Sequence, residues 1–567
     1  MTSPGLGEDP TPPDTRVAEL PDDPEEKIYS DPEVMVDVMP PVDVVSVDHA
    51  EPSVEPPQVY PGAASGRDEV TTVERRLRVH GLFRMPDLSA AVSSVARVER
   101  LPAHTIYEVY YDTADLRLAR WGATLCRRQG GADEGWHLSL PVEATKGELD
   151  EVRLPLGETE DMPPVLSDLV VAFRRNEPLV PVASLRTERT EYVLKDATGH
   201  GAARVLDDTV SVLDGEHIAA RFRELEVVAT DVDAALDPIV QLLAARGALP
   251  GAPPRAMTAL GPVTQEPADI PDPQVVSPQD PAGAAVTAHI RRHAKALLLQ
   301  DVRVRRDLPD SVHQMRVAAR RLRSGLKVFE PLLEVEWAQS LREELGWVAG
   351  ELGVSRDTEV LMARLDHHAD EVGIEFAPLI RAVVDPTLSE QWRDAREHAM
   401  AAMSSPRYFD FLDRLVDAAR RPRLTDYSMQ PGEYVLPGLV DKAWRKLEKE
   451  IHHLRLDGPS PPWHEARIRA KKARYAAEAV APVLGDRLKQ FAKSLSSVTE
   501  VLGEHQDAWV AQQTLKSMAA SPGVDGLAGF SLGLLHEFEF QQEMFDRKDF
   551  MDLWPSVKRS HKKAQLG

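Results

Sequence analysis

The sequence of 567 residues contains one cysteine, Cys126, and few aromatic side chains, 6% of the total. A single cysteine excludes a disulfide framework and a cysteine-rich zinc module. It is typical of a reducing compartment, so we expect a cytoplasmic protein. No run of 18 apolar residues is present, and we therefore expect no transmembrane helix and no membrane partner. The first ten residues lack the basic and apolar regions of a secretory signal, so none is expected.

Positive charge is the minority charge in this chain. The 67 lysines and arginines stand against 91 acids, and the formal net charge is −24, which argues against general coating of nucleic acid. Residues 1–70 hold 17 acids and 3 bases, residues 71–281 hold 33 and 22, and residues 282–567 hold 41 and 42. The C-terminal part is balanced, so its bases can cluster without an effect on the total charge.

Proline marks two breaks in the chain. Residues 1–66 carry 13 of the 45 prolines and show no sustained hydrophobic period, which predicts a disordered acidic tail. Residues 262–281 carry six prolines and predict a semi-extended linker. Two domains follow from these breaks, at 67–261 and 282–564.

The first domain contains short segments that alternate with period two, at 72–79, 123–128, 136–140 and 222–228. The alternation places three sets of residues on common strand faces: Thr72, Glu74 and Arg76; Cys126 and Arg128; Glu224 and Glu226. Acids and bases on one face are unusual in a dry core. They suit a wet barrel in which arginines bind phosphate and carboxylates hold Mg²⁺ or Mn²⁺. Solvated outer faces with cross-strand ion pairs are the alternative.

The segment 110–128, together with 72–76 and 224–226, resembles the signature of the CYTH, or triphosphate tunnel metalloenzyme, family. The resemblance covers roughly 70–261. It implies a closed antiparallel β-barrel that binds triphosphate groups with a divalent metal and in many members hydrolyses them. It implies these triphosphate-binding candidates: Arg76, Arg128, Arg186 and Arg189. It also implies these metal-side candidates: Glu74, Asp207, Glu224 and Glu226.

Four residues depart from that family pattern. Thr72 stands in place of a glutamate, Cys126 of an arginine and Pro141 of a lysine. Arg204 stands where an acid is expected. Phosphoryl transfer depends on positioning and charge neutralisation, so each loss should slow hydrolysis. The sequence leaves two alternatives, an active metal-dependent triphosphatase and a barrel that only binds.

The C-terminal part shows the 3.6-residue period of helices and an internal repeat. Residues 312–324 align with 463–475 at an offset of 151, and Asp357 aligns with Asp507 at an offset of 150. Several matches at nearly constant offset indicate a duplicated helical unit. We expect two helical bundles related by a pseudo-twofold axis, at about 282–430 and 431–564.

Each repeat carries a basic stripe on one helix. At about 100° per residue, the stripe residues fall within about 80° of one helix face. The first stripe comprises His313, Arg316, Arg320 and Arg323, and the second comprises His464, Arg467, Lys471 and Arg474. Further candidates for the same anion are Arg291, Lys295, Arg321, Lys442, Lys446 and Lys472. Like charges at this spacing destabilise a helix, so their duplication indicates a polyanionic ligand; a solvated or ion-paired face is the alternative.

This duplicated, histidine-led pattern resembles the CHAD domain (conserved histidine α-helical domain) over about 282–564. The resemblance implies a helical domain that binds inorganic polyphosphate, and it implies a location at polyphosphate granules. A CYTH domain followed by a CHAD domain is a known arrangement. The expected fold is therefore multidomain α+β, an antiparallel barrel followed by an all-α duplicated bundle.

Two other functions stay open. A nucleic-acid-binding module is disfavoured because the stripes lack Asn, Tyr and Phe for base contacts. A scaffold could use the stripes to dock acidic protein partners, including the chain's own acidic tail.

Overall fold

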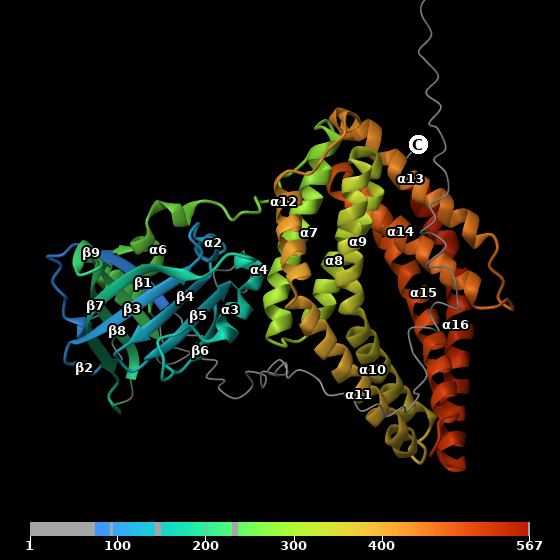
Figure 1. The fold of residues 1–567 in the computed structure, drawn as a ribbon, viewed down its shortest axis with the longest axis horizontal. Coiled ribbons are helices and arrows are strands. Elements are labelled where there is room, and N and C mark those ends of the chain that lie inside the picture. The colour runs from blue at the N-terminus through green and yellow to red at the C-terminus, as the bar shows by residue number, and fades with distance from the viewer. Residues whose placement is uncertain (1–73, 91–94, 142–148, 200, 230–235, 565–567) are drawn as a thin grey trace, which may run out of the picture.

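The computed structural model describes residues 74–90, 95–141, 149–199, 201–229 and 236–564. The predicted tail at 1–66 and Thr72 lie outside these ranges. An antiparallel sheet is followed by a helical domain, which confirms the predicted fold class (Figure 1). Within the described ranges, no helix is both long and apolar enough to cross a membrane.

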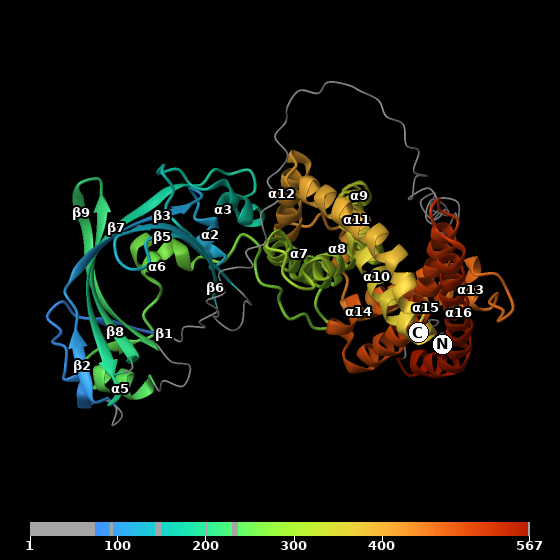
Figure 2. The same cartoon turned by 90° about the horizontal axis from the view of Figure 1, so that it is seen from below.

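The alternating segments form strands of one antiparallel sheet. The strands are β1 (Glu74–Val79), β2 (Arg97–Arg100), β3 (His104–Asp112), β4 (Thr124–Gln129), β5 (Gly135–Pro141), β6 (Leu149–Leu154), β7 (Val180–Lys195), β8 (Gly201–Asp214), β9 (His217–Ala229) and β10 (Leu249–Pro250). Their hydrogen-bonded order is β10-β1-β9-β8-β7-β3-β4-β5-β6, and β2 also pairs with β7. The sheet curls strongly, and the short helix α6 (Arg255–Leu260) lies inside the curve (Figure 2).

Short helices complete the sheet domain. They are η1 (Leu88–Ala90), α2 (Arg117–Arg120), α3 (Pro164–Leu169), α4 (Val171–Arg174), α5 (Asp237–Ala245) and η2 (Pro262–Gln265). Leu77 and Leu225 pack against Leu243 of α5 on the outer face of the sheet. Because side chains alternate along a strand, the neighbours Arg76, Glu224 and Glu226 face the inside of the curve.

Helices make up the rest of the chain. They are α7 (Ala282–Arg305), α8 (Ser311–Val328), α9 (Val335–Glu351), α10 (Gly353–Val372), α11 (Ala377–Met403), α12 (Pro406–Arg420), α13 (Gly432–Ile451), α14 (Pro461–Leu484), α15 (Asp486–Ala519) and α16 (Gly526–Ala564), with η3 (Glu330–Leu332) and η4 (Asp426–Met429) between them. The helical domain therefore begins at α7, directly after Pro281.

The starts of the two helical repeats pair with each other. Pro281 and Pro431 form an isolated antiparallel bridge just before α7 and α13. The amide of Ala282 donates to the carbonyl of Gln430 at 2.8 Å, and the amide of Gly432 donates to the carbonyl of Asp280 at 2.9 Å. These reciprocal contacts, 150 residues apart, are those expected at a pseudo-twofold axis between duplicated units.

The predicted linker packs between the two domains. Asp269 and Ile270 within it are buried. Asp269 accepts a hydrogen bond from Trp121 Nε1 at 2.8 Å and pairs with Arg175, whose Nε also donates to Asp413 of α12 at 2.7 Å. The linker segment therefore contacts the sheet domain directly and is connected to the helical domain through Arg175.

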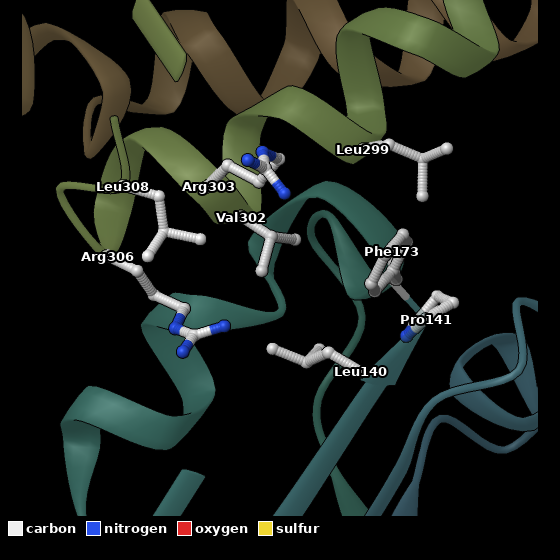
Figure 3. Close-up of a pocket in the computed structure, with 8 residues that line it drawn as sticks. All are labelled: Leu140, Pro141, Phe173, Leu299, Val302, Arg303, Arg306 and Leu308. Atoms are coloured by element: carbon white, nitrogen blue, oxygen red, sulfur yellow. The ribbon is translucent and has the colours of Figure 1, made fainter. Parts of the chain in front are cut away.

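A small cavity lies in the interface between the domains (Figure 3). The sheet domain contributes Leu140, Pro141 and Phe173, and the end of α7 and the turn after it contribute Leu299, Val302, Arg303, Arg306 and Leu308. Pro141, which stands in place of an expected lysine, thus ends β5 next to the helical domain.

Candidate functional site

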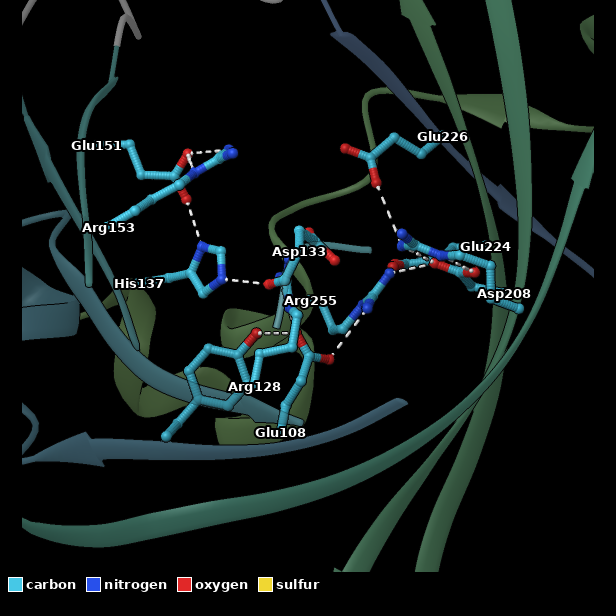
Figure 4. A network of polar contacts seen from close by, with 12 residues as sticks. Glu108, Arg128, Asp133, His137, Glu151, Arg153, Asp208, Glu224, Glu226 and Arg255 are labelled. Atoms are coloured by element: carbon cyan, nitrogen blue, oxygen red, sulfur yellow. Dashed lines mark hydrogen bonds and ion pairs between the residues drawn. The ribbon is translucent and has the colours of Figure 1, made fainter. Parts of the chain in front are cut away.

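Buried charged side chains fill the inside of the curved sheet (Figure 4). The carboxylates of Glu108, Asp208 and Glu224 come from β3, β8 and β9, and each is at most 5% exposed. All three contact the guanidinium of Arg255, the first residue of α6. Arg255 was absent from the sequence-based candidates because it follows the last strand and matches no motif quoted above.

Two of the predicted phosphate-binding arginines belong to this same network. Arg128 donates to Glu108 Oε1 at 3.0 Å and also pairs with Asp133. Arg189 donates to Asp208 through two nitrogens, at 2.9 and 2.7 Å. Both guanidinium groups are thus already held by carboxylates of the barrel.

A second group lies at the edge of the network, on β1 and β9. Arg76 Nη2 contacts Glu74 Oε1 at 2.8 Å and Glu226 Oε1 at 3.5 Å. Partial burial, followed by the neighbouring Glu226, raises the pKa of Glu74. Despite burial, the hydrogen bond from Glu74 and the charge of Arg76 lower the pKa of Glu226. A carboxyl with a raised pKa beside a carboxylate is a place where a cation can replace a proton.

Two sequence candidates lie outside the barrel interior. Asp207 points to the other face of β8 and pairs with Arg223 at 2.7 Å, because its neighbour Asp208 takes the inner position. Arg186 is three residues from Arg189 on β7, so the strand alternation places it on the outer face. Arg204, at a position expected to be acidic, lies 3.6 Å from Glu191.

The implied divalent metal fits one part of this arrangement. Glu74 and Glu226 offer adjacent, partly accessible carboxylate oxygens of the kind that Mg²⁺ and Mn²⁺ prefer. Glu224 does not fit, because it is buried as well as held by Arg255 Nε at 2.9 Å, and Asp207 lies on the other face. Among the described residues, no group of three or more His, Cys, Asp or Glu side chains is arranged to hold a metal ion.

The two predicted basic stripes lie together in the helical domain, where α8 and α14 pack against each other. Arg320 of α8 lies 5.9 Å above the ring of Tyr475 on α14, and Arg321 lies 3.7 Å from Glu478 on the same helix. Tyr475 is buried, so its ring supports arginines and is not a stacking platform for bases. We call the surface formed by Arg316, Arg320, Arg467, Lys471 and Arg474 the stripe junction.

Positive charges in the stripe junction crowd one another. Burial, followed by the neighbouring Arg467 and Arg320, lowers the pKa of Lys471 to about 7. The Nε atoms of Arg320 and Arg467 are buried and have no hydrogen-bond partner among the described residues. Neither Arg320 nor Lys471 has an ion pair with a described carboxylate within 4.0 Å. Crowded bases with open donors are a favourable setting for an anion.

A few acids lie beside the stripe junction. Arg316 pairs with Asp357 at 2.9 Å, and Arg467 lies 4.0 Å from Asp507. The two aspartates are repeat-related, and Asp357 is largely exposed, with 74% of its side chain accessible. Arg474 pairs with Glu478 at 2.9 Å. These contacts neutralise the edges of the stripe junction and leave its centre positive.

The histidines that begin the two stripes have buried or hydrogen-bonded rings. His464 Nδ1 contacts Gln506 Oε1 at 2.7 Å, and burial lowers the pKa of this histidine. Burial also lowers the pKa of His313. Both shifts favour the neutral ring, so any contact with an anion would use a neutral N–H group.

Several other sequence candidates lie away from the stripe junction. Arg291 Nε donates to the carbonyl of Ala419 at 3.0 Å, and Lys295 pairs with Asp272 of the linker. Arg323 packs beside Gly346 of α9. The remaining predicted bases are Arg321, described above, and Lys442, Lys446 and Lys472, which are exposed on α13 and α14. The structure thus brings together only part of the predicted polyphosphate set.

Two family models match the chain in the order expected from the sequence. The model of the CYTH domain matches residues 71–249, and the model of the CHAD domain matches residues 288–516. An uncharacterized protein of Mycobacterium tuberculosis (strain H37Rv) is 34% identical over 497 residues, which are 82% of this chain and 92% of that protein. The chain belongs to the family in which a CYTH domain is followed by a CHAD domain.

Two solved structures are similar to about half of the chain. PptA from Streptomyces chartreusis is 25% identical, with a TM-score of 0.43, and the match covers 48% of this chain and 99% of that one. The CHAD domain from the plant Ricinus communis is 22% identical, with a TM-score of 0.40, and the match covers 50% of this chain and 95% of that one.

Proposed function

We propose that this protein binds inorganic polyphosphate at the stripe junction of its CHAD domain. The observation that carries the proposal is the meeting of Arg320 and Lys471, from two different repeats, where positive charges crowd one another and no carboxylate of the described residues forms an ion pair with either side chain. A linear polyanion supplies many closely spaced negative charges, and its oxygens accept hydrogen bonds from guanidinium and ammonium groups. Polyphosphate has no bases, so its binding at the stripe junction needs no aromatic side chain for stacking.

The CYTH domain would bind a triphosphate group or the end of a polyphosphate chain. Glu74 and Glu226 would hold one Mg²⁺ or Mn²⁺, and Arg76 between them would contact a phosphate oxygen. The bound cation would neutralise phosphate charge. We expect any hydrolysis to be slow, because Arg128 and Arg189 are already held by Glu108 and Asp208.

A titration of the full chain with long-chain polyphosphate tests the proposal. Binding should be tight at low salt and should weaken steeply as salt rises, because phosphate contacts release counterions. Duplex DNA at equal phosphate concentration should not displace the polyphosphate. The absence of binding at low salt would contradict the proposal, and displacement by DNA would favour a nucleic-acid-binding module.

The CYTH domain needs a separate assay. Phosphate release from tripolyphosphate, with Mg²⁺ or Mn²⁺ and with chelator as the control, measures turnover independently of the stripe junction. Fluorescence imaging of the tagged protein would test the predicted location at polyphosphate granules.

A docking surface for an acidic protein is the second candidate function. The exposed Asp357 beside Arg316 gives the stripe junction a rim of mixed charge, of the kind found at protein interfaces. An acidic partner would be displaced by polyphosphate in competition, and a partner that is not displaced would bind elsewhere.

A further inference from the structure

Inside the barrel, the guanidinium of Arg255 lies at the centre of a buried group of carboxylates. Arg255 is 7% exposed, and all three of its guanidinium nitrogens are used. Nε donates to Glu224 at 2.9 Å, Nη1 donates to Glu108 at 3.0 Å, and Nη2 donates to Asp208. One guanidinium therefore bridges carboxylates from three different strands (Figure 4).

The group has no excess of positive charge. Arg128 also contacts Glu108 and Arg189 also contacts Asp208, so three guanidinium groups meet these three carboxylates, and Arg128 pairs with Asp133 as well. Buried carboxylates that lose such partners are strongly unfavourable. A phosphate would find little uncompensated positive charge at this depth.

Packing of α6 holds Arg255 in position. Ala256 packs against Tyr110 and Leu185 on the inner face of the sheet. Cys126 belongs to the same cluster and is 5% exposed. A small neutral side chain at position 126 leaves space for α6 in the interior, where a long charged side chain would compete with Arg255 for the same carboxylates.

The three carboxylates come from separate strands and have the oxygen ligands that hard divalent cations prefer, but Arg255 lies among them, and with Arg255 in place these described residues form no metal site. We propose that Arg255 is a built-in cation that takes the place of a divalent metal at the deep end of the barrel. The chain then binds an external divalent cation only at Glu74 and Glu226. Removal of the guanidinium converts Glu108, Asp208 and Glu224 into a site for Mn²⁺ or Mg²⁺.

Counting bound Mn²⁺ on the full chain tests this inference. The wild-type protein should bind at most one equivalent, and Arg255→Gln should bind one more. Arg255→Lys is the matched control, because it keeps a positive charge and should gain no equivalent. Glu226→Gln is then added to the wild type and to Arg255→Gln. In both proteins it should abolish Mn²⁺ binding at Glu74 and Glu226. The additional Mn²⁺ bound by Arg255→Gln should remain.

Thermal unfolding gives a second measurement. Arg255→Gln should unfold at a lower temperature than the wild type in chelator, and Mn²⁺ should raise its midpoint by more than it raises that of the wild type, since a ligand stabilises the state that binds it. If Arg255→Gln folds only when Mn²⁺ is present during refolding, that result also supports the inference.

Arg255→Gln on its own could fail to fold, because it leaves three buried carboxylates without the guanidinium. The double variant Arg255→Gln with Glu108→Gln has one buried negative charge fewer and addresses that case. It should fold and bind the extra Mn²⁺ more weakly than Arg255→Gln does. The inference is overturned if the folded variants bind no extra Mn²⁺, or if no variant folds with or without Mn²⁺. It is also overturned if the wild type binds a second equivalent that Asp208→Asn abolishes. Polyphosphate binding at the stripe junction is a separate readout and should be unchanged in the folded variants.

Discussion

The barrel interior and the stripe junction contain similar numbers of arginines, and they differ in what those arginines contact. In the barrel, Arg128, Arg189 and Arg255 each contact a buried carboxylate. At the stripe junction, Arg320 lies over a tyrosine ring and crowds Lys471. The content of basic residues is therefore a poor guide to an anion site, and the pairing of those residues is a better one.

The comparison predicts that neutralising one acid lowers the stability of the protein more in the barrel than beside the stripe junction. Glu108→Gln should destabilise the protein by about 3–5 kcal/mol, because Arg255 and Arg128 each lose one carboxylate partner inside the barrel. Asp357→Asn, the matched change beside the stripe junction, should cost under about 1 kcal/mol, since its side chain is largely exposed. Denaturant unfolding of the two variants measures the difference. Equal losses would show that the barrel charges are not held as the structure shows.

Charge reversal should have its largest effect on polyphosphate at the stripe junction. Arg320→Glu with Lys471→Glu should weaken binding about 100-fold or more, since each charge-assisted hydrogen bond contributes about 1.5–3 kcal/mol. The control is Lys493→Glu with Lys558→Glu, which changes the net charge equally at exposed positions on α15 and α16. Titrations at one salt concentration compare them. Similar losses in both double variants would indicate a diffuse charge effect and no defined site.

Lys471 makes binding at the stripe junction depend on pH. Its pKa of about 7 means that the side chain is charged below pH 7 and becomes neutral above it. Polyphosphate affinity should therefore fall by about tenfold between pH 6.5 and 8.5, given that one pKa unit corresponds to about 1.4 kcal/mol.

Lys471→Arg separates this titration from the other groups that face Lys471, which are Arg320, Arg467, Arg474 and Asp507. Arginine stays charged over this range, so the variant should show a nearly flat pH profile. A variant whose affinity falls as steeply as that of the wild type would assign the titration to another group.

The smallest expected effect comes from the acids beside the stripe junction. Asp357→Asn with Asp507→Asn should tighten polyphosphate binding about threefold, because exposed or weak ion pairs contribute only about 0.2–1 kcal/mol. Titration at low salt is the most sensitive measurement. Weaker binding would mean that these aspartates orient Arg316 and Arg467 for the ligand.

Sequence patterns predicted much of the barrel and missed single positions. The period of two placed Glu224 with Glu226, and Arg76 with Glu74, on shared strand faces, and the pairing of β1 with β9 brings the two faces together. It could not choose between Asp207 and Asp208, because a shift of one residue exchanges the two faces of a strand. Arg255 lies on a short helix, and only the folding of α6 into the curved sheet brings it to three distant carboxylates.

The helical domain shows a similar division. The repeat was visible at offsets of 150 and 151, and the paired bridge at Pro281 and Pro431 is consistent with it. The helical period placed each basic stripe on one face, as α8 and α14 have it. Arg291 and Lys295, which were predicted to extend the stripes, contact α12 and the linker.

The sequence by itself determined the order of the two domains, the duplication of the second, and which residues share a strand or helix face, because these follow from local periodicity. Tertiary structure alone decided which charges are neutralised. The energy of a charge depends on groups within a few ångströms of it, and those groups come from distant parts of the chain. Arg255 therefore contacts three buried carboxylates, whereas Lys471 lies among bases from both repeats.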